Sequence, residues 1–259
     1  MFRSKRSALI STFVGGFFLL VFYQNMTPVE FSTLNMPAID ENARKDQAQE
    51  LLGSHYIGSV AQSLEGQRDL NYLVFKKLEA SLAKEWTRWI PQLTKELIRE
   101  SKSRDMDPIF VLAIIQTESQ FNTYAKGTSG EIGLMQILPQ TGEWIAKKYN
   151  IPWNGPNTLY DPIANVKIGI AYFSYLRSQF ESRAHHYVPA YNMGPKNVRR
   201  VARDIASVGE DERTLLNGIY GSKVMRNYQM IYQQMVAVPQ PKGPKVARAN
   251  GGDETTETR

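Results

Sequence analysis

The glutamate Glu118 follows an unusually apolar stretch of chain and is the first residue whose position could support chemistry. Residues 109–115 are all apolar, and Asp107 and Pro108 precede them. This pattern predicts a buried helix that starts at Pro108 with Asp107 as its cap. Helical spacing places Glu118 on the same face as apolar residues of that run. Burial and the negative end of the helix dipole both penalise the carboxylate, which predicts a raised pKa and a carboxyl able to act as a general acid.

Three further motifs accompany this glutamate. Taken alone, a carboxyl at the end of a core helix is more often a solvated structural residue than a catalytic one. Downstream, a glycine-rich turn leads into Gly133-Leu134-Met135-Gln136, and later come Ala190-Tyr191-Asn192-Met193-Gly194 and Arg226-Asn227-Tyr228. Together with Glu118-Ser119, and in this order, these motifs resemble those of the soluble lytic transglycosylase family. The resemblance covers about residues 105–238.

The resemblance implies a fold and an activity. The family shares an all-α, lysozyme-like fold with goose-type lysozymes, and we find helical patterns throughout residues 105–238, without alternating strand signals. Family members cut the peptidoglycan glycan strand between N-acetylmuramic acid and N-acetylglucosamine and leave 1,6-anhydromuramic acid ends. Neither a cofactor nor a metal is implied.

The resemblance also implies a role for each matching residue. Glu118 is expected to be the sole catalytic acid and base, and Ser119 to hydrogen-bond the substrate or the glutamate. The remaining matches are expected to contact substrate or to position the glutamate: Gly133 by close backbone approach, Met135 and Gln136 by lining the cleft, Tyr191 and Asn192 beside the scissile bond, and Tyr228 by orienting Glu118. The sequence departs from the family pattern at Met193, Val224 and Pro189.

Most glycosidases use two carboxylates, so a partner for Glu118 is the next question. Asp107 and Asp161 precede prolines and are expected to cap helices. Glu131 lies in a glycine-flanked loop and Glu143 on a helix, and we expect both side chains to be exposed. Without a second carboxylate, the acetamido group of the substrate would assist the reaction. Two alternatives stay open, namely a muramidase-type hydrolase using the same glutamate and a non-catalytic peptidoglycan-binding scaffold of an envelope machine.

Composition narrows the classes of site. The chain of 259 residues has no cysteine, which excludes disulfides and thiolate metal sites. Its three histidines, His55, His185 and His186, are too few and too scattered to predict a zinc site, and the adjacent pair is expected in an exposed loop. The formal net charge of +6 is modest and does not predict a nucleic-acid partner.

Four regions are expected along the chain. Residues 1–28 hold three basic residues and then an apolar run at 8–23, which predicts an uncleaved inner-membrane anchor and a periplasmic enzyme; a cleaved signal peptide is the alternative. Residues 29–103 are a helical extension whose apolar stripe Pro91 should kink or split. Residues 104–238 are the catalytic domain, with a last helix at about 222–236, and residues 239–259 are a disordered tail.

Overall fold

The computed structural model describes residues 31, 34–67 and 69–237. The chain divides into two compact units at residues 36 and 37, and the second unit holds every helix discussed below. The expected anchor at 8–23 and the expected tail at 239–259 lie outside the described residues. Within the described ranges, no helix is both long enough and apolar enough to cross a bilayer.

The extension folds into several short helices, as the sequence predicts. They are α2 (Glu41–Leu52), η2 (Gly53–Tyr56), α3 (Val60–Ser63), α4 (Leu70–Ser81), η3 (Lys84–Trp89) and α5 (Ile90–Ser103). Of the two outcomes expected at Pro91, a kink or a split, the structure shows a split, because η3 ends at Trp89 and α5 begins at Ile90. The chain also breaks earlier, at Leu82 and Ala83, where the backbone is extended, and Pro91 stands in the first turn of α5. Proline is tolerated there because its missing N–H has no partner in a first helical turn.

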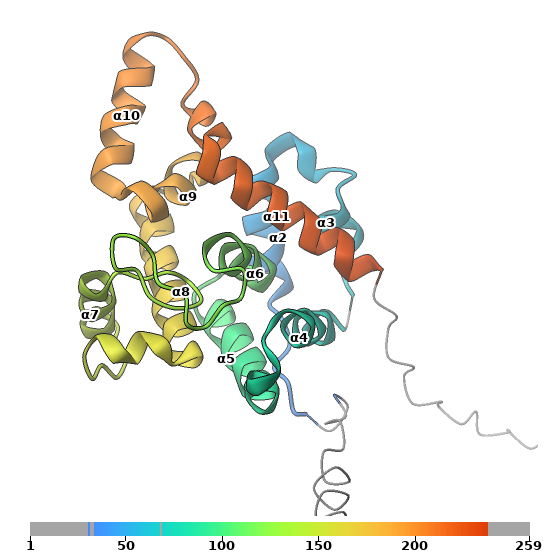
Figure 1. Ribbon diagram of the computed structural model, residues 1–259. Helices are drawn as coiled ribbons and strands as arrows, with labels where there is room; N and C mark the ends of the chain where they lie inside the picture. Colours follow the sequence, from blue (N-terminus) through green and yellow to red (C-terminus); the bar gives the residue numbers. More distant parts are fainter. Residues whose placement is uncertain (1–30, 32–33, 68, 238–259) are drawn as a thin grey trace, which may run out of the picture. The chain divides into compact units, whose positions relative to one another are not determined.

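Helix α6 (Pro108–Glu118) is the centre of this unit, and every residue of 108–115 is buried. As predicted, Asp107 caps it, because the Asp107 carboxylate accepts a hydrogen bond from the Ile109 N–H at 2.8 Å. Helices α5 and α11 (Ile219–Val236) pack against α6 from two sides (Figure 1). The ring of Phe110 meets Phe173, Tyr187 and Tyr228 edge to face, so aromatic side chains from three other helices close around α6.

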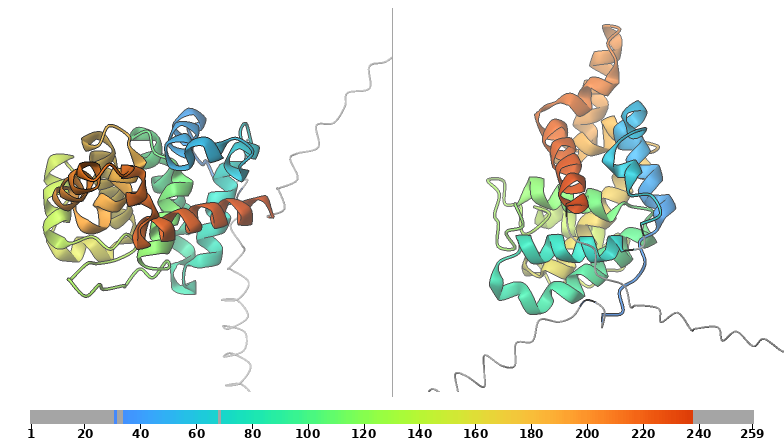
Figure 2. Two further views of the ribbon diagram at one scale, coloured as in Figure 1. Left: turned by 90° about the horizontal axis from the view of Figure 1, so that it is seen from above. Right: turned by 90° about the vertical axis from the view of Figure 1, so that its right-hand side faces the viewer.

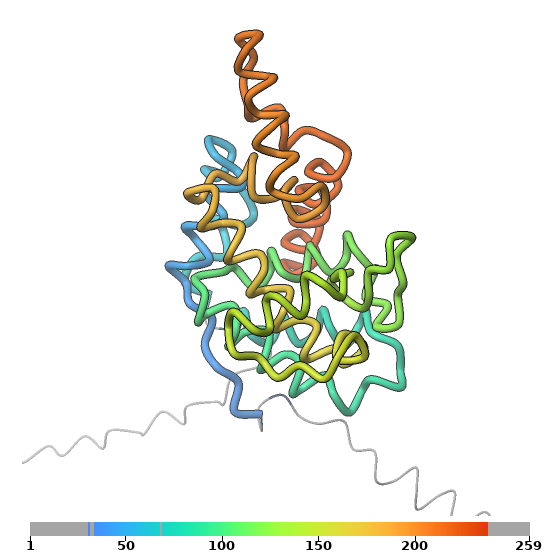
Figure 3. The backbone as a smooth tube through the Cα atoms, turned by 90° about the vertical axis from the view of Figure 1, so that its left-hand side faces the viewer, coloured from blue at the N-terminus to red at the C-terminus, as the bar shows by residue number. Residues whose placement is uncertain are grey.

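Six further helices of the described residues lie between α6 and α11 in the chain. They are α7 (Pro139–Lys148), η4 (Pro156–Tyr160), α8 (Pro162–Gln179), α9 (Ala184–Met193), α10 (Pro195–Ser207) and η5 (Glu212–Asn217). Between α6 and α7 the chain forms a long loop held by two isolated β-bridges that share Ile132. Helix α10 packs against α9 and η5 but otherwise extends away from the other helices (Figures 2 and 3). The unit is thus all-α in its described residues, apart from those bridges.

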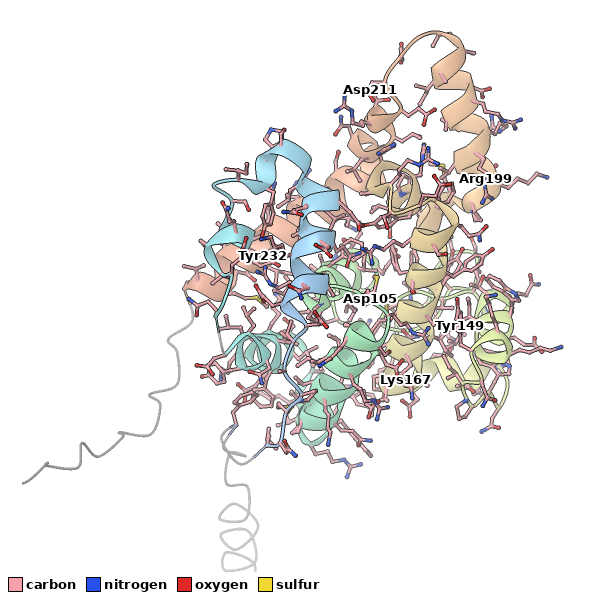
Figure 4. All side chains as sticks on the ribbon, turned by 180° about the vertical axis from the view of Figure 1, so that it is seen from behind. Asp105, Tyr149, Lys167, Arg199, Asp211 and Tyr232 are labelled. Atoms are coloured by element: carbon pink, nitrogen blue, oxygen red, sulfur yellow. The ribbon has the colours of Figure 1, made fainter. Side chains whose placement is uncertain are left out.

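The extension packs on α11 and on the start of α6 through buried polar groups. The Arg44 side chain of α2 is fully buried and donates to the Tyr232 hydroxyl at 2.9 Å. Tyr232 lies on α11 and is labelled in Figure 4. Gln47, also on α2 and fully buried, accepts from the Asp107 N–H at 2.7 Å. A buried polar group without a hydrogen-bond partner would cost folding free energy. The hydrogen bond between Gln47 and Asp107 therefore makes α2 and α6 stabilise each other. The extension is therefore part of the same packed unit and not a separate arm.

Candidate active site

Glu118 is the last residue of α6, and its carboxyl group is half-buried. Burial raises the pKa of Glu118 from 4.5 to about 7, because the ionised form loses hydration. Two groups of α11 oppose that shift: the Tyr220 hydroxyl, which donates to Glu118 Oε1 at 2.6 Å, and the positive charge of Lys223. Glu118 is therefore able to exchange a proton close to neutral pH, as the sequence predicts.

The Glu118 carboxyl opens into a cavity of about 440 Å³. This cavity is large enough for part of a polymer such as a glycan chain, and both polar and aromatic groups face it. Its walls come from α6, the loop after it, α7, α8 and the end of α9. The lining residues are Glu118, Gly127, Thr128, Glu131, Gln136, Ile137, Leu138, Thr141, Tyr172, Tyr191, Asn192, Met193 and Gly194.

Two residues of the Glu118-Ser119 and Gly133-to-Gln136 motifs fix the loop and do not face the cavity. The buried Ser119 hydroxyl donates to the Leu134 carbonyl at 2.8 Å, so it ties the end of α6 to the loop. Gly133 has a positive φ of 79°, and a Cβ there would lie 2.4 Å from the Asn165 amide nitrogen. The close approach expected of Gly133 therefore occurs, but toward α8.

Met135 and Gln136 take opposite orientations. Met135 is fully buried, and its sulfur lies so close to Gly169 of α8 that a Cβ at Gly169 would be 2.3 Å away. Met135 thus packs beneath the cavity and does not line it, which corrects its expected role. Gln136 does line the cavity. Its amide nitrogen donates to the Ala125 and Gly133 carbonyls, which leaves the amide oxygen available to a ligand.

Tyr191 and Asn192 both line the cavity, at the end of α9. The Tyr191 ring stacks on Phe173, with ring centroids 4.1 Å apart. Its hydroxyl donates to the Met135 carbonyl at 2.7 Å, which locks the ring in place. Asn192 is exposed. These positions are consistent with the expected substrate contacts, with Tyr191 as a rigid wall and Asn192 as a free polar group.

Tyr228 does not orient Glu118, and this is the main correction to the site inferred from sequence. Its fully buried hydroxyl donates to Asp107 Oδ2 at 2.6 Å, at the opposite end of α6. Tyr220 contacts the glutamate instead. Tyr220 lies outside the last helix expected from the sequence, at about 222–236, whereas α11 begins at Ile219. The two tyrosines are eight residues apart, so α11 spans the length of α6 and reaches both ends.

Two other expectations about charged residues also change. Glu131 is not a freely exposed loop residue, because it lines the cavity with Glu118 and its carboxylate accepts from the Ser129 N–H at 3.0 Å. The negative charge of Glu131 contributes to the raised pKa of Glu118. His185 and His186 are not in a loop; they lie in the first turn of α9, and His186 is buried. Glu143, in contrast, is exposed as expected.

The arrangement can transfer a proton to a bound ligand and take one back. A half-buried acid with a pKa near 7 faces a cavity, a tyrosine hydroxyl fixes one of its oxygens, and a stacked aromatic wall borders the space. General acid and base catalysis is most efficient when the pKa lies near the ambient pH.

Comparisons with known proteins agree with this geometry. Residues 96–213 match the family model described as Transglycosylase SLT domain. The chain is 36% identical over 102 residues to the soluble lytic murein transglycosylase of Salmonella typhimurium, covering 39% of this chain and 16% of that protein. It is 31% identical over 180 residues to the membrane-bound lytic murein transglycosylase C of Histophilus somni, covering 61% of this chain and 48% of that protein.

A solved structure shows the same fold. The 70 kDa soluble lytic transglycosylase of Escherichia coli superposes with a TM-score of 0.50 and 22% identity, over 78% of this chain and 38% of that one. The chain thus spans less than half the length of each of these three proteins. The family match agrees with the resemblance noted in the motifs over residues 96–213, which include Glu118, Gly133-Leu134-Met135-Gln136 and Tyr191-Asn192.

Proposed function

We propose that the protein is a peptidoglycan lytic transglycosylase and that Glu118 is its catalytic acid and base. One observation carries the proposal: the carboxyl at the end of the buried helix α6 has a pKa raised to about 7 and faces the cavity. The match of residues 96–213 to the SLT domain and the names of the relatives supply the substrate, the murein glycan strand.

In the proposed reaction, Glu118 first acts as an acid. It gives its proton to the oxygen between N-acetylmuramic acid and N-acetylglucosamine, and the bond from that oxygen to C1 of the muramyl sugar breaks. The acetamido group of the muramyl sugar stabilises the positive charge that develops at C1. Ionised Glu118 then takes the proton of the 6-hydroxyl of the same sugar, whose oxygen bonds to C1. A 1,6-anhydro end forms, no water is consumed, and Glu118 regains its proton.

Residues around the cavity have proposed roles in binding. Gln136 and Asn192 offer amide groups to the sugars, and the Tyr191 ring forms a wall beside the scissile position. Tyr220 holds Glu118 Oε1, so it orients the carboxyl toward the glycosidic oxygen. The basic and apolar start of the chain supports an inner-membrane anchor at 8–23, with the enzyme in the periplasm.

A hydrolase of the muramidase type is a second candidate, and Glu131 is the observation that favours it. A second carboxylate in the cavity is what glycosidases use to activate water or to form a covalent intermediate. Hydrolysis would leave a reducing muramic acid end, whereas transglycosylation leaves the anhydro end, which is lighter by one water molecule. The two reactions therefore differ in product mass.

The test is digestion of purified sacculi by the full-length protein, followed by mass spectrometry of the released muropeptides. We expect anhydromuramyl products, with Glu118→Gln inactive and Glu143→Gln, an exposed glutamate on α7, as active as the wild type. Reducing ends that depend on both Glu118 and Glu131 would support the hydrolase instead. Full release of muropeptides by Glu118→Gln would contradict both enzymatic assignments.

A further inference from the structure

Three potential metal ligands meet where the first turn of α9 approaches η5, near the labelled residue Asp211 in Figure 4. One imidazole nitrogen each from His185 and His186 and one carboxylate oxygen of Glu212 all lie within 4.8 Å of one another. Glu212 and His185 are half-buried, and His186 is buried. None of the three residues lines the cavity that holds Glu118. The cluster is therefore a feature that the proposed glycan chemistry does not use.

His186 has unfilled bonding capacity although it is buried. Only 4% of the His186 surface is exposed, and neither of its ring nitrogens has a hydrogen-bond partner among the described residues. Glu212 Oε2 comes within 2.9 Å of Nε2, but off the direction that a hydrogen bond requires. Buried imidazoles normally bond through at least one nitrogen, and a missing ion is one reason for an exception. Two side chains that bind the same ion can also lie close together without a hydrogen bond between them, because both point toward the metal.

We propose that His185, His186 and Glu212 form a binding site for a zinc-class divalent ion that fastens η5 to α9. Two imidazoles and one carboxylate are a common zinc ligand set, and imidazole nitrogen disfavours Ca²⁺ and Mg²⁺. In a tetrahedral zinc site, ligand atoms lie roughly 3.4 Å apart. A water molecule would complete the coordination.

The nearby charges permit such an ion. The positive charge of Arg183 acts on both histidines, and its guanidinium is engaged by Glu181 at 3.2 Å and by the Phe180 carbonyl. On the η5 side, Asp211 caps the turn by accepting from the Arg213 N–H, and its carboxylate also pairs with the Arg213 guanidinium, with Nε at 2.6 Å. Bound zinc would stabilise the contact between α9, whose last turn holds Tyr191 and Asn192, and η5, which leads into α11 and Tyr220. The ion would thus stabilise the helix that carries Tyr191 and the approach to Tyr220, which contacts Glu118, without touching substrate.

Zinc binding to the full-length chain tests the proposal directly. The protein is purified on a tag without histidine, stripped with EDTA, freed of chelator and titrated with Zn²⁺ in a calorimeter. We expect one ion per chain with micromolar or tighter affinity, a rise in melting temperature, and, with Co²⁺ as a probe, the intense visible bands of a four-coordinate site. His185→Gln and Glu212→Gln should each weaken binding at least tenfold.

The third histidine supplies a matched control. His55 is exposed on η2 and outside the cluster, so His55→Gln should bind zinc like the wild type. Melting of the metal-free variants checks that the substitutions leave the fold intact. Wild-type protein that fails to bind zinc overturns the site, as does equal affinity in the wild type and the double variant His185→Gln, Glu212→Gln. Loss of binding in His55→Gln alone would also contradict it.

Discussion

Helix α6 holds a carboxyl group at each end, and a tyrosine of α11 donates to each of them. At the first end, Asp107 is fully buried and its carboxylate accepts from Ile109, Tyr228 and Tyr232. At the other end, Glu118 is half-buried, and among the described residues one hydrogen bond, from Tyr220, reaches its carboxyl. Burial raises the pKa of both groups. The difference is what fills the remaining acceptor positions: protein at Asp107, and an open cavity at Glu118.

This comparison separates a structural acid from a reactive one. A buried carboxyl whose acceptors are filled by the protein anchors helices, because removing it leaves several donors unpaired. A buried carboxyl that keeps free acceptor positions and a cavity can bind and protonate a ligand. The tyrosine partner and the raised pKa are common to both ends, so neither one alone identifies the catalytic group.

Replacement of Glu118 should have the largest effect on activity. Glu118→Gln keeps the shape but cannot exchange a proton, so we expect muropeptide release to fall by roughly a thousandfold or more. Asp107→Asn, the matched change at the other end of α6, should reduce activity only as far as it reduces the folded fraction. Initial rates on sacculi, corrected for folded protein, measure the difference. If Glu118→Gln and Asp107→Asn lost the same activity after this correction, Glu118 and Asp107 would not differ as a reactive and a structural acid.

Substitutions of Asp107 and Glu118, at the two ends of α6, should change the free energy of unfolding in opposite directions. Asp107→Ala removes a cap and leaves two buried tyrosine hydroxyls without their acceptor, so we expect a loss of about 3 kcal/mol of unfolding free energy. Glu118 behaves differently, because its folded pKa lies above the value of 4.5 for a free glutamate. Its contribution is fully present below pH 4.5 and is lost as pH rises to about 7.

Glu118→Gln avoids that loss. Relative to the wild type, the variant should gain about 2 kcal/mol of stability between pH 4 and pH 8, allowing for the exposed part of the carboxyl. Urea unfolding at the two pH values measures this change. A gap between variant and wild type that stays constant with pH would show that Glu118 is not held in its protonated form.

Substitutions of Tyr220 and Tyr228 on α11 should also have different effects. Tyr220→Phe removes a hydrogen bond that favours ionised Glu118, so the pKa of Glu118 should rise and the alkaline limb of the activity profile should move to higher pH. The rate should fall about tenfold, since the carboxyl loses its orientation. Tyr228→Phe should leave that profile in place and instead cost about 1–2 kcal/mol of stability. If Tyr228→Phe moved the alkaline limb and Tyr220→Phe only lowered stability, Tyr228 would be the tyrosine that orients Glu118, as the motif implied.

The smallest effects concern two charges near Glu118. The Glu131 charge raises the pKa of Glu118 and the Lys223 charge lowers it. Glu131→Gln should therefore move the alkaline limb of the activity profile to lower pH, and Lys223→Met should move it to higher pH. The pH dependence of kcat/KM measures both shifts. Shifts in the same direction would mean that these charges do not act on Glu118 through their field.

Much of the fold was predictable because its signals are local. The apolar run before Glu118 predicts a buried helix, and Asp107 and Asp161 stand before prolines at helix starts, where both do cap helices. The break at Leu82 and Ala83 was not predicted, since its residues carry no turn signal and the apolar stripe continues past it. The sequence did not predict that α2 packs on α11, because the contact between Arg44 and Tyr232 joins residues far apart in the chain.

The candidate site was predicted in part, for similar reasons. Glu118, Gln136, Tyr191 and Asn192 meet at one cavity, as the motifs indicate. The motif could not show that Met135 faces α8, because side-chain direction in an irregular loop has no period. Glu131 and Tyr220 were missed since their approach to Glu118 depends on how the loop after α6 and the start of α11 fold back.

Titration of Glu118 tests the central claim most directly. Carbon-13 NMR of the full-length protein labelled at the glutamate side-chain carboxyl carbons follows each group through pH 3 to 9, and the resonance missing in Glu118→Gln identifies the one of interest. The account predicts a midpoint near pH 7 for that resonance, in agreement with the pKa of about 7. A midpoint near 4.5, as for a glutamate in free solution, would contradict the assignment of Glu118 as an acid that is protonated before the bond breaks.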